Sequence, residues 1–95
     1  MDFTPDSRLS PMPNVHARRF DNEMILLDLN KGLYFGLDEV GAAMWEGFVE
    51  GHTMLEVVKS LAGKYQVSEP KLLEDARELA RKLTEAGLAV VRTGE

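Results

Sequence analysis

The sequence predicts an α+β fold, in which a three-stranded antiparallel sheet is followed by three helices in a winged-helix-like arrangement. Two patterns lead to this prediction. Residues 15–37 contain three short apolar runs of the kind that forms strands, with turn residues between them. Residues 38–87 contain three runs in which apolar residues recur every three or four positions, as on one face of a helix. A chain of 95 residues has room for one hydrophobic core.

The strands are expected in the first part of the chain. Val15–Phe20 alternates apolar and polar side chains, which is typical of a half-buried strand. Residues 24–29 are almost continuously apolar, so we expect this strand to be covered on both faces. Residues 30–32 supply a hairpin loop, and Leu33–Leu37 forms the third strand. As the last strand of the sheet, it is an edge unless another element covers it.

The helices are delimited by residues that cap helix ends. Asp38 is the N-cap of the first helix, and Gly51 ends that helix. Thr53 and Glu56 have the spacing of a capping box, which opens the second helix. The apolar stripe of this helix consists of Met54, Val57, Val58, Leu61, Ala62 and Tyr65.

The third predicted helix is the longest. It begins at Ser68, tolerates Pro70 in its first turn and ends at Gly87. Its apolar stripe consists of Leu72, Leu73, Ala76, Leu79, Ala80 and Leu83. Residues 88–91 then form a short terminal extension.

The domain is expected to span residues 15–92. Residues 1–14 contain prolines and serines without hydrophobic periodicity, so we expect an extended or disordered N-terminal segment. No apolar run approaches the ~20 residues that a membrane helix needs, so no membrane association is expected. The chain has no cysteine, which excludes a disulfide framework, and a cytoplasmic location fits this composition.

The charge distribution argues against nucleic-acid binding. The chain carries a net charge of −5, and residues 38–56 hold five acidic residues without any lysine or arginine. The third helix, which would read DNA in a winged-helix protein, has four basic residues among five acidic ones. Proteins that bind nucleic acids show the opposite imbalance, so no nucleic-acid partner is expected.

No catalytic or metal-binding constellation can be assembled from these residues. His16 and His52 are the only histidines, and neither has a second ligand at a metal-binding spacing. The acidic pair Glu74 and Asp75 lies about 100° apart around a helix, so the two carboxylates cannot face one substrate. We therefore expect neither an enzyme nor a cofactor.

Peptide binding is the function that remains. The predicted edge strand Leu33–Leu37 stands beside an amphipathic helix, so an extended peptide can add to it as a fourth strand. Pockets between this strand and the helix would take side chains of the peptide. An isolated edge can also pair with its own copy, and a homodimer through this edge is a further hypothesis for the peptide-free protein.

The order of residues 15–90 resembles that of PqqD-like domains. Three segments carry the resemblance: first Leu26, Leu27, Asp28, Gly32, Tyr34, Leu37, Asp38, Gly41 and Trp45; then Gly51, Thr53, Glu56, Val57, Leu61 and Tyr65; and finally Asp75, Ala76, Leu79, Leu83, Gly87 and Leu88. Each element alone is a weak signal, whereas the ordered set is fairly specific.

The resemblance implies a function in the biosynthesis of ribosomally made, modified peptides. PqqD-like domains are precursor-recognition elements, and this chain looks most like the free-standing version of lasso-peptide biosynthesis. There the leader segment of the precursor pairs antiparallel with the third strand and lies against the third helix. The implied peptide-binding residues are Leu33, Tyr34, Phe35, Gly36, Leu37, Leu72, Asp75, Ala76 and Leu79. On the helix, Asp75 and Arg77 point about 200° apart and cannot both face one groove. Asp75 is the stronger candidate for a polar contact, because the matching motif includes Asp75 and nothing comparable supports Arg77.

The resemblance also implies a partner enzyme. In lasso-peptide biosynthesis the leader is delivered to a separate leader peptidase, a transglutaminase-like cysteine protease. This chain has no cysteine and is therefore not that protease. Two alternatives stay open: a PQQ-type chaperone that presents a peptide to a radical enzyme, and a winged-helix regulator that binds DNA, which the charge disfavours.

Overall fold

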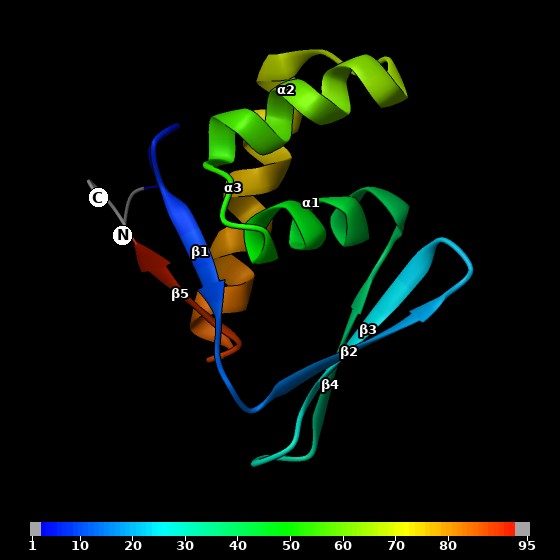
Figure 1. The fold of residues 1–95 in the computed structure, drawn as a ribbon, viewed down its shortest axis with the longest axis vertical. Coiled ribbons are helices and arrows are strands. Elements are labelled where there is room, and N and C mark those ends of the chain that lie inside the picture. Colours follow the sequence, from blue (N-terminus) through cyan, green and yellow to red (C-terminus); the bar gives the residue numbers. More distant parts are fainter. Residues whose placement is uncertain (1–2, 93–95) are drawn as a thin grey trace.

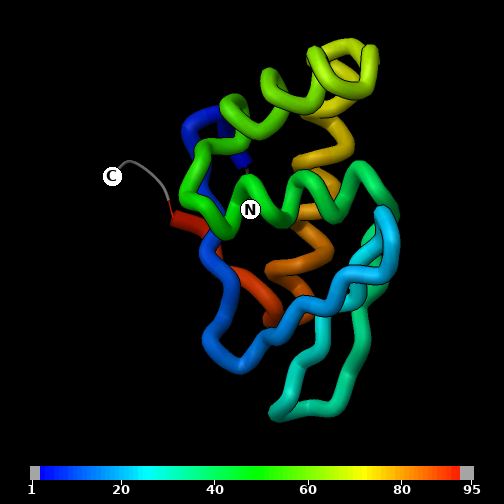
Figure 2. Tube along the Cα trace, turned by 45° about the vertical axis from the view of Figure 1, so that its right-hand side comes forward, coloured from blue at the N-terminus to red at the C-terminus, as the bar shows by residue number. Residues whose placement is uncertain are grey.

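The computed structural model describes residues 3–92 of the chain (Figure 1). Its elements follow in the order β1 (Arg8–Pro11), β2 (Val15–Phe20), β3 (Glu23–Asp28), β4 (Leu33–Leu37), α1 (Glu39–Val49), α2 (Met54–Tyr65), α3 (Glu69–Glu85) and β5 (Ala89–Arg92). The α+β prediction is confirmed, since β2, β3 and β4 form an antiparallel sheet and the three helices follow it. Figures 1 and 2 show α2 at one end of the molecule and this sheet at the other, with α1 between them.

The strand order β2-β3-β4 leaves β2 and β4 at the two edges of the sheet. In the register of this sheet, Leu26 lies opposite Phe35 and Met24 lies opposite Leu37. Met24, Leu26 and Leu37 are buried against the helices. Because side chains alternate along a strand, this register defines an inner face of the sheet, toward α1, and an outer face.

The expectation that residues 24–29 are covered on both faces is wrong. Side chains on the inner face of β3 are buried, whereas Ile25 and Leu27 on the outer face remain half-buried. No described element packs on the outer face, so the apolar run is covered on one side only. The strand also ends at Asp28, one residue before Leu29, because Asp28 organises the following turn.

Asp28 is a buried carboxylate that holds the β3–β4 hairpin. Its Oδ1 accepts hydrogen bonds from the backbone N–H of Asn30 (2.9 Å) and Lys31 (3.2 Å) and from Nδ2 of Asn14 (2.8 Å). Burial raises the pKa of Asp28, but these hydrogen bonds outweigh the burial and leave the pKa below its usual value. Gly32 completes the turn with a left-handed φ of 68°.

The N-terminal segment contributes to the core, which the sequence analysis did not expect. Its backbone is extended at Arg8–Pro11, where β1 pairs antiparallel with β5. Leu9 of β1 is only 2% exposed. The carbonyl groups of Pro5 and Ser7 accept hydrogen bonds from the first amides of α2, at 3.0 and 2.8 Å. This segment thus joins β5 to the start of α2.

The predicted helix caps are present. Asp38 accepts from the amide of Gly41 at the start of α1. Thr53 and Glu56 form the reciprocal capping box of α2, at 3.1 and 2.8 Å. Ser68 caps α3 by accepting from the amide of Lys71. All three helix starts therefore agree with the residue types at those positions.

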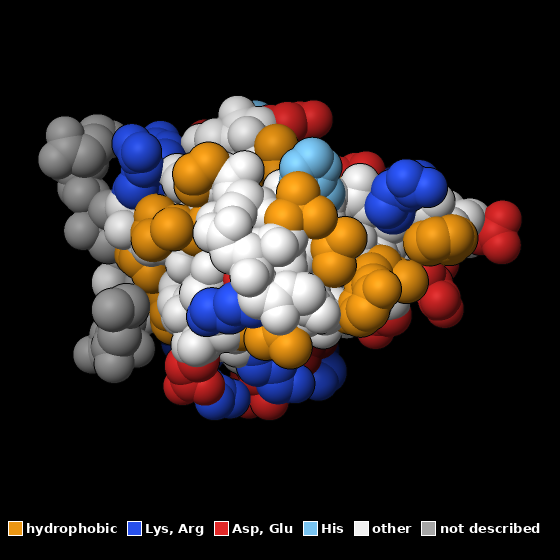
Figure 3. Space-filling model, turned by 90° about the horizontal axis from the view of Figure 1, so that it is seen from below, with side chains coloured by type: hydrophobic (Ala, Val, Ile, Leu, Met, Phe, Trp, Pro, Cys, Tyr) orange, Lys and Arg blue, Asp and Glu red, His pale blue; other side chains and the backbone are white. Residues whose placement is uncertain are grey.

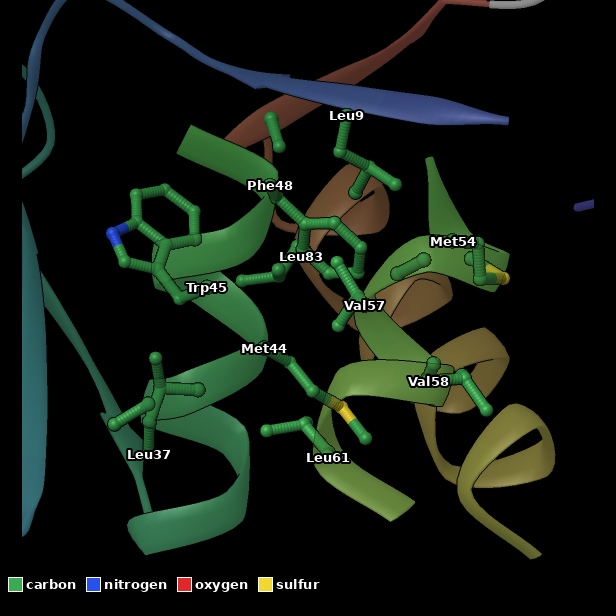
Figure 4. Packing of buried hydrophobic residues seen from close by; sticks show 14 of the residues in the cluster. Leu9, Leu37, Met44, Trp45, Phe48, Met54, Val57, Val58, Leu61 and Leu83 are labelled. Carbon is green, nitrogen blue, oxygen red and sulfur yellow. The ribbon is translucent and has the colours of Figure 1, made fainter. Parts of the chain in front are cut away.

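The core lies between the three helices (Figure 4). Met44 and Phe48 of α1 project toward Val57 and its buried neighbours on α2, whereas Trp45 projects from another side of α1, away from α2. Helices α1 and α2 approach closely at Gly47, where an added Cβ would stand 2.7 Å from a methyl group of Val57. Within residues 3–92, no helix is long and apolar enough to cross a membrane.

Candidate functional site

A groove of about 640 Å³ lies between β4, the start of α1 and α3. Its volume is in the range of ~300–1,000 Å³ that is typical of ligand sites. Its lining residues are Phe35, Gly36, Leu37, Asp38, Val40, Gly41, Met44, Val67, Lys71, Leu72, Asp75, Glu78, Leu79 and Lys82. The groove therefore runs directly alongside the edge strand of the sheet.

The floor of the groove is apolar. Phe35 and Leu37 reach it from the inner face of β4, because they alternate with Gly36 along the strand. Met44 of α1 and Leu72 of α3 are buried beneath it. Leu79, two turns further along α3, is partly buried and lines the wall. An apolar side chain that enters this groove would lose its contact with water, which stabilises binding.

The rim of the groove is charged. Lys71 Nζ donates to Asp75 Oδ1 at 3.1 Å, one helical turn away on α3. The hydrogen bond to Asp75 and the attraction of its charge raise the pKa of Lys71. Both side chains are substantially exposed, so this ion pair contributes little to stability. Lys82 lies at the other end of the groove, where no ion pair within residues 3–92 involves it.

Strand β4 and helix α3 run in opposite directions along the groove (Figure 1). The hairpin loop that precedes β4 lies at the end of α3, since an added Cβ on Gly87 would stand 3.3 Å from Lys31 Nζ. Leu37, the last residue of β4, leads into α1. A segment that pairs antiparallel with β4 would therefore run in the same direction as α3.

The outer edge of β4 is open. Among the described strands, β4 pairs with β3 alone. In an antiparallel ladder, alternate residues direct their N–H and C=O groups away from the neighbouring strand. The edge therefore presents backbone donors and acceptors beside the apolar floor, which is the arrangement that strand addition requires.

Six of the nine predicted site residues line the groove: Phe35, Gly36, Leu37, Leu72, Asp75 and Leu79. Ala76 is 0% exposed and lies in the core beneath it. Leu33 and Tyr34 are 57% and 76% exposed and lie outside the lining, Tyr34 on the outer face of the sheet. Arg77 points elsewhere on α3, where its Nε donates to the carbonyl group of Phe3 at 3.1 Å.

The sequence analysis missed the contribution of α1 to the groove. Val40 and Met44 line it from one face of α1, and Val67 closes it before α3 begins. The i, i+4 spacing of Val40 and Met44 was the available signal, since such residues share a helix face. The charged rim residues Glu78 and Lys82 were also missed, because the sequence of an amphipathic helix does not show which of its charged residues border a groove and which face only solvent.

The two histidines lie apart from the groove. His16 belongs to the outer face of β2. His52 stands between Glu50 and Glu56, at 3.4 and 3.5 Å, in the connection between α1 and α2. Throughout residues 3–92, no three histidine, cysteine or acidic side chains are grouped so that they could hold a metal ion.

The chain is similar to proteins of known structure. The chain resembles two solved structures, each with a TM-score of 0.78. One, "TbiB1 in Complex with the TbiA(beta) Leader Peptide", is 34% identical over 84% of this chain and 93% of that chain. The other, "Lasso peptide synthetase B1 complexed with the leader peptide", is 28% identical over 90% of this chain and 98% of that chain. No curated protein matches the sequence.

A family model also matches the chain. The model, described as "Coenzyme PQQ synthesis protein D (PqqD)", aligns with residues 23–89. These residues contain the β3–β4 hairpin, all three helices and the whole lining of the groove. The match thus covers more than half of the chain, and the chain belongs to the PqqD family.

Proposed function

We propose that this protein binds the leader segment of a ribosomally synthesised precursor peptide, specifically a lasso-peptide precursor, by adding it as a strand to β4. The open edge of β4 beside an apolar groove carries this proposal. The resemblance to two proteins whose structures contain leader peptides supports it. Alternate residues of the leader would point into the groove, while its backbone would bond to Leu33–Leu37.

The floor of the groove would provide most of the affinity. Burying one large apolar side chain stabilises a complex by ~1.5–3 kcal/mol before the cost of ordering the peptide. The backbone hydrogen bonds would fix the register and direction of the leader. With antiparallel pairing, the leader would enter near Lys71 and leave near Lys82 and the hairpin loop.

The protein would act without catalysing a reaction. In our proposal it delivers the bound precursor, in the cytoplasm, to a transglutaminase-like cysteine peptidase that removes the leader. This chain has no cysteine to serve as the nucleophile of such an enzyme. Its part would be to raise the local concentration of the precursor and to present it in an extended form.

Hydrogen exchange of backbone amides tests the geometry. On addition of the TbiA(beta) leader peptide, which is present in one of the two similar structures, amides on the open edge of β4 should gain protection. The amides on the free edge of β2 are the matched control, because they belong to the other edge of the same sheet. Binding with protection at β2, or with no change at β4, would refute strand addition here. A scrambled leader should leave both edges unchanged.

A second candidate function is that of a peptide chaperone for a radical enzyme. The description of the family model, which names coenzyme PQQ synthesis, favours it. Both candidates use the same groove, so leader binding does not separate them. Association of the loaded protein with a radical enzyme, and not with a cysteine peptidase, would select the second candidate.

A further inference from the structure

One basic side chain of α3 borders the groove without an acidic partner. Lys82 is exposed and lines the groove near the end of α3. Figure 3 views the molecule from the end that carries the β3–β4 hairpin loop, and basic and acidic side chains lie side by side along its lower margin. Arg81 stands 3.8 Å from both Glu78 and Glu85. Both acids lie within about one helical turn of Lys82, yet no ion pair among residues 3–92 involves it.

A second lysine lies at the same end of the groove. Lys31 of the hairpin loop places its Nζ 3.3 Å from the position of an added Cβ on Gly87, just beyond α3. It too forms no ion pair with another described residue. The helix macrodipole favours a basic residue in the last turn of α3, which accounts for the charge of Lys82. The dipole does not account for its position on the groove, because any side of that turn would satisfy it.

The acids along the α3 rim of the groove are already close to basic groups. Asp75 accepts from Lys71, and Glu78 lies near Arg81. The unmatched charge of this rim is therefore positive and lies at Lys82. The whole chain carries −5, so its overall field favours basic peptides. A preference for an acid at one position of a bound peptide would thus have to come from a local basic group.

We propose that Lys82 is a specificity residue, which favours leaders that carry a carboxylate beside it in the C-terminal half of the bound segment. The assignment rests on the proposed function and deepens it, because pairing antiparallel with β4 takes the leader past Asp75 first and past Lys82 afterwards. Hydrogen bonds between an ammonium and a carboxylate are stronger than those between neutral groups. The apolar floor would accept many peptides of suitable shape, and Lys82 would discriminate among them.

The spacing along α3 limits where this carboxylate lies in the leader. Lys82 follows Asp75 by seven residues, which is about 10 Å along the helix axis. An extended peptide covers that distance in about three residues, and only alternate residues face the groove. A lysine side chain is long enough to reach to either side. The carboxylate is therefore expected on the first or second inward-facing residue after the one beside Asp75.

A positional scan of one peptide tests the role of Lys82. Each residue of the TbiA(beta) leader peptide is replaced in turn by Glu and by Lys. Fluorescence anisotropy gives the affinity of every peptide for the unmodified protein, Lys82→Glu, Lys82→Gln and Lys59→Glu. Lys59 is the matched control, because it is exposed on α2, lies outside the groove and gives the same change of net charge. Thermal unfolding verifies that each variant is folded.

At one position in the C-terminal half of the bound segment, the unmodified protein should bind the Glu peptide about fivefold more tightly than the Lys peptide. Lys82→Glu should reverse this preference at that position alone. Lys82→Gln, which adds no negative charge to the last turn of α3, should abolish it without reversal, and Lys59→Glu should leave it in place.

Three outcomes would overturn the role of Lys82: equal binding of the Glu and Lys peptides at every position, a preference that survives in both Lys82 variants, and a preference that Lys59→Glu also abolishes. The last outcome would assign the preference to net charge rather than to contact. If no peptide of the scan binds the unmodified protein, the proposed function itself fails.

Discussion

Tyr34 and Phe35 are neighbours in β4, yet their side chains lie on opposite faces of the sheet. Phe35 lines the groove and Tyr34 is 76% exposed on the outer face. A strand of period two makes this separation unavoidable. One short strand therefore contributes an open edge, one wall of a groove and part of the exposed outer face of the sheet.

Leu79→Ala should weaken leader binding about tenfold, because Leu79 lines the groove and its loss removes apolar contact with the leader. Leu73→Ala is the matched control, since Leu73 is also partly buried on α3 but does not line the groove. Calorimetric titration of both variants measures the difference. Equal weakening in the two would show that the loss reflects the stability of α3 rather than contact with the peptide.

Asp75→Asn should weaken leader binding about tenfold while the melting temperature stays unchanged. The pair with Lys71 is exposed, and such pairs stabilise a helix by only ~0.3–0.5 kcal/mol. A hydrogen bond from the leader to the Asp75 carboxylate in a partly dry groove is worth ~1.5–3 kcal/mol. Glu74→Gln, one position away and outside the groove, is the control. An unchanged affinity would show that the Asp75 carboxylate makes no contact with the leader and is a solvated surface group.

Asp28→Asn should make the free energy of unfolding less dependent on pH in the acidic range. The pKa of Asp28 is below its usual value in the folded protein, so the ionised carboxylate stabilises the fold above the unfolded pKa of about 3.9. This contribution is lost as the pH falls through the folded pKa. Urea unfolding at pH 7 should therefore show the variant to be less stable than the unmodified protein, and the difference should shrink toward pH 3. A difference that stays constant with pH would show that the carboxylate charge plays no part.

Gly47→Ala should destabilise the protein by about 1–3 kcal/mol, because its methyl group would stand too close to Val57 at the crossing of α1 and α2. Gly63→Ala should instead stabilise it by about 0.5–1 kcal/mol, since Gly63 lies in α2 with nothing within 4 Å of an added Cβ. Chemical unfolding of the two variants gives both values. Effects of the same sign would contradict the packing of α1 against α2.

Leu9→Ala should destabilise the protein by about 2–5 kcal/mol, as expected for a buried leucine. Val90→Ala, on the neighbouring strand β5, should have little effect because Val90 is exposed. Thermal unfolding of the pair shows whether the segment before residue 15 belongs to the cooperative unit. A melting temperature unaffected by Leu9→Ala would show that β1 does not contribute to the stability of the core.

Local sequence determined the three strands of the β2–β3–β4 sheet and the starts of the three helices. Alternation predicted β2, an apolar run after a hairpin loop predicted β4, and the three N-caps Asp38, Thr53 and Ser68 stand where they were predicted. These features depend on residues within a few positions of one another, so a single sequence contains them. The edge position of β4 also followed from the order of the strands.

Tertiary structure decided everything that joins distant segments. The pairing of Leu9 with Val91 spans most of the chain, and short polar-apolar segments carry no local signal for such a pairing. The groove combines Phe35, Met44 and Leu79 from three elements, and only their packing shows which apolar residues stay near solvent and which, like Ala76, are buried. The apolar stripe of a helix indicates which side chains face the protein. The neighbouring elements on that side determine whether such a side chain is buried in the core or lines a site.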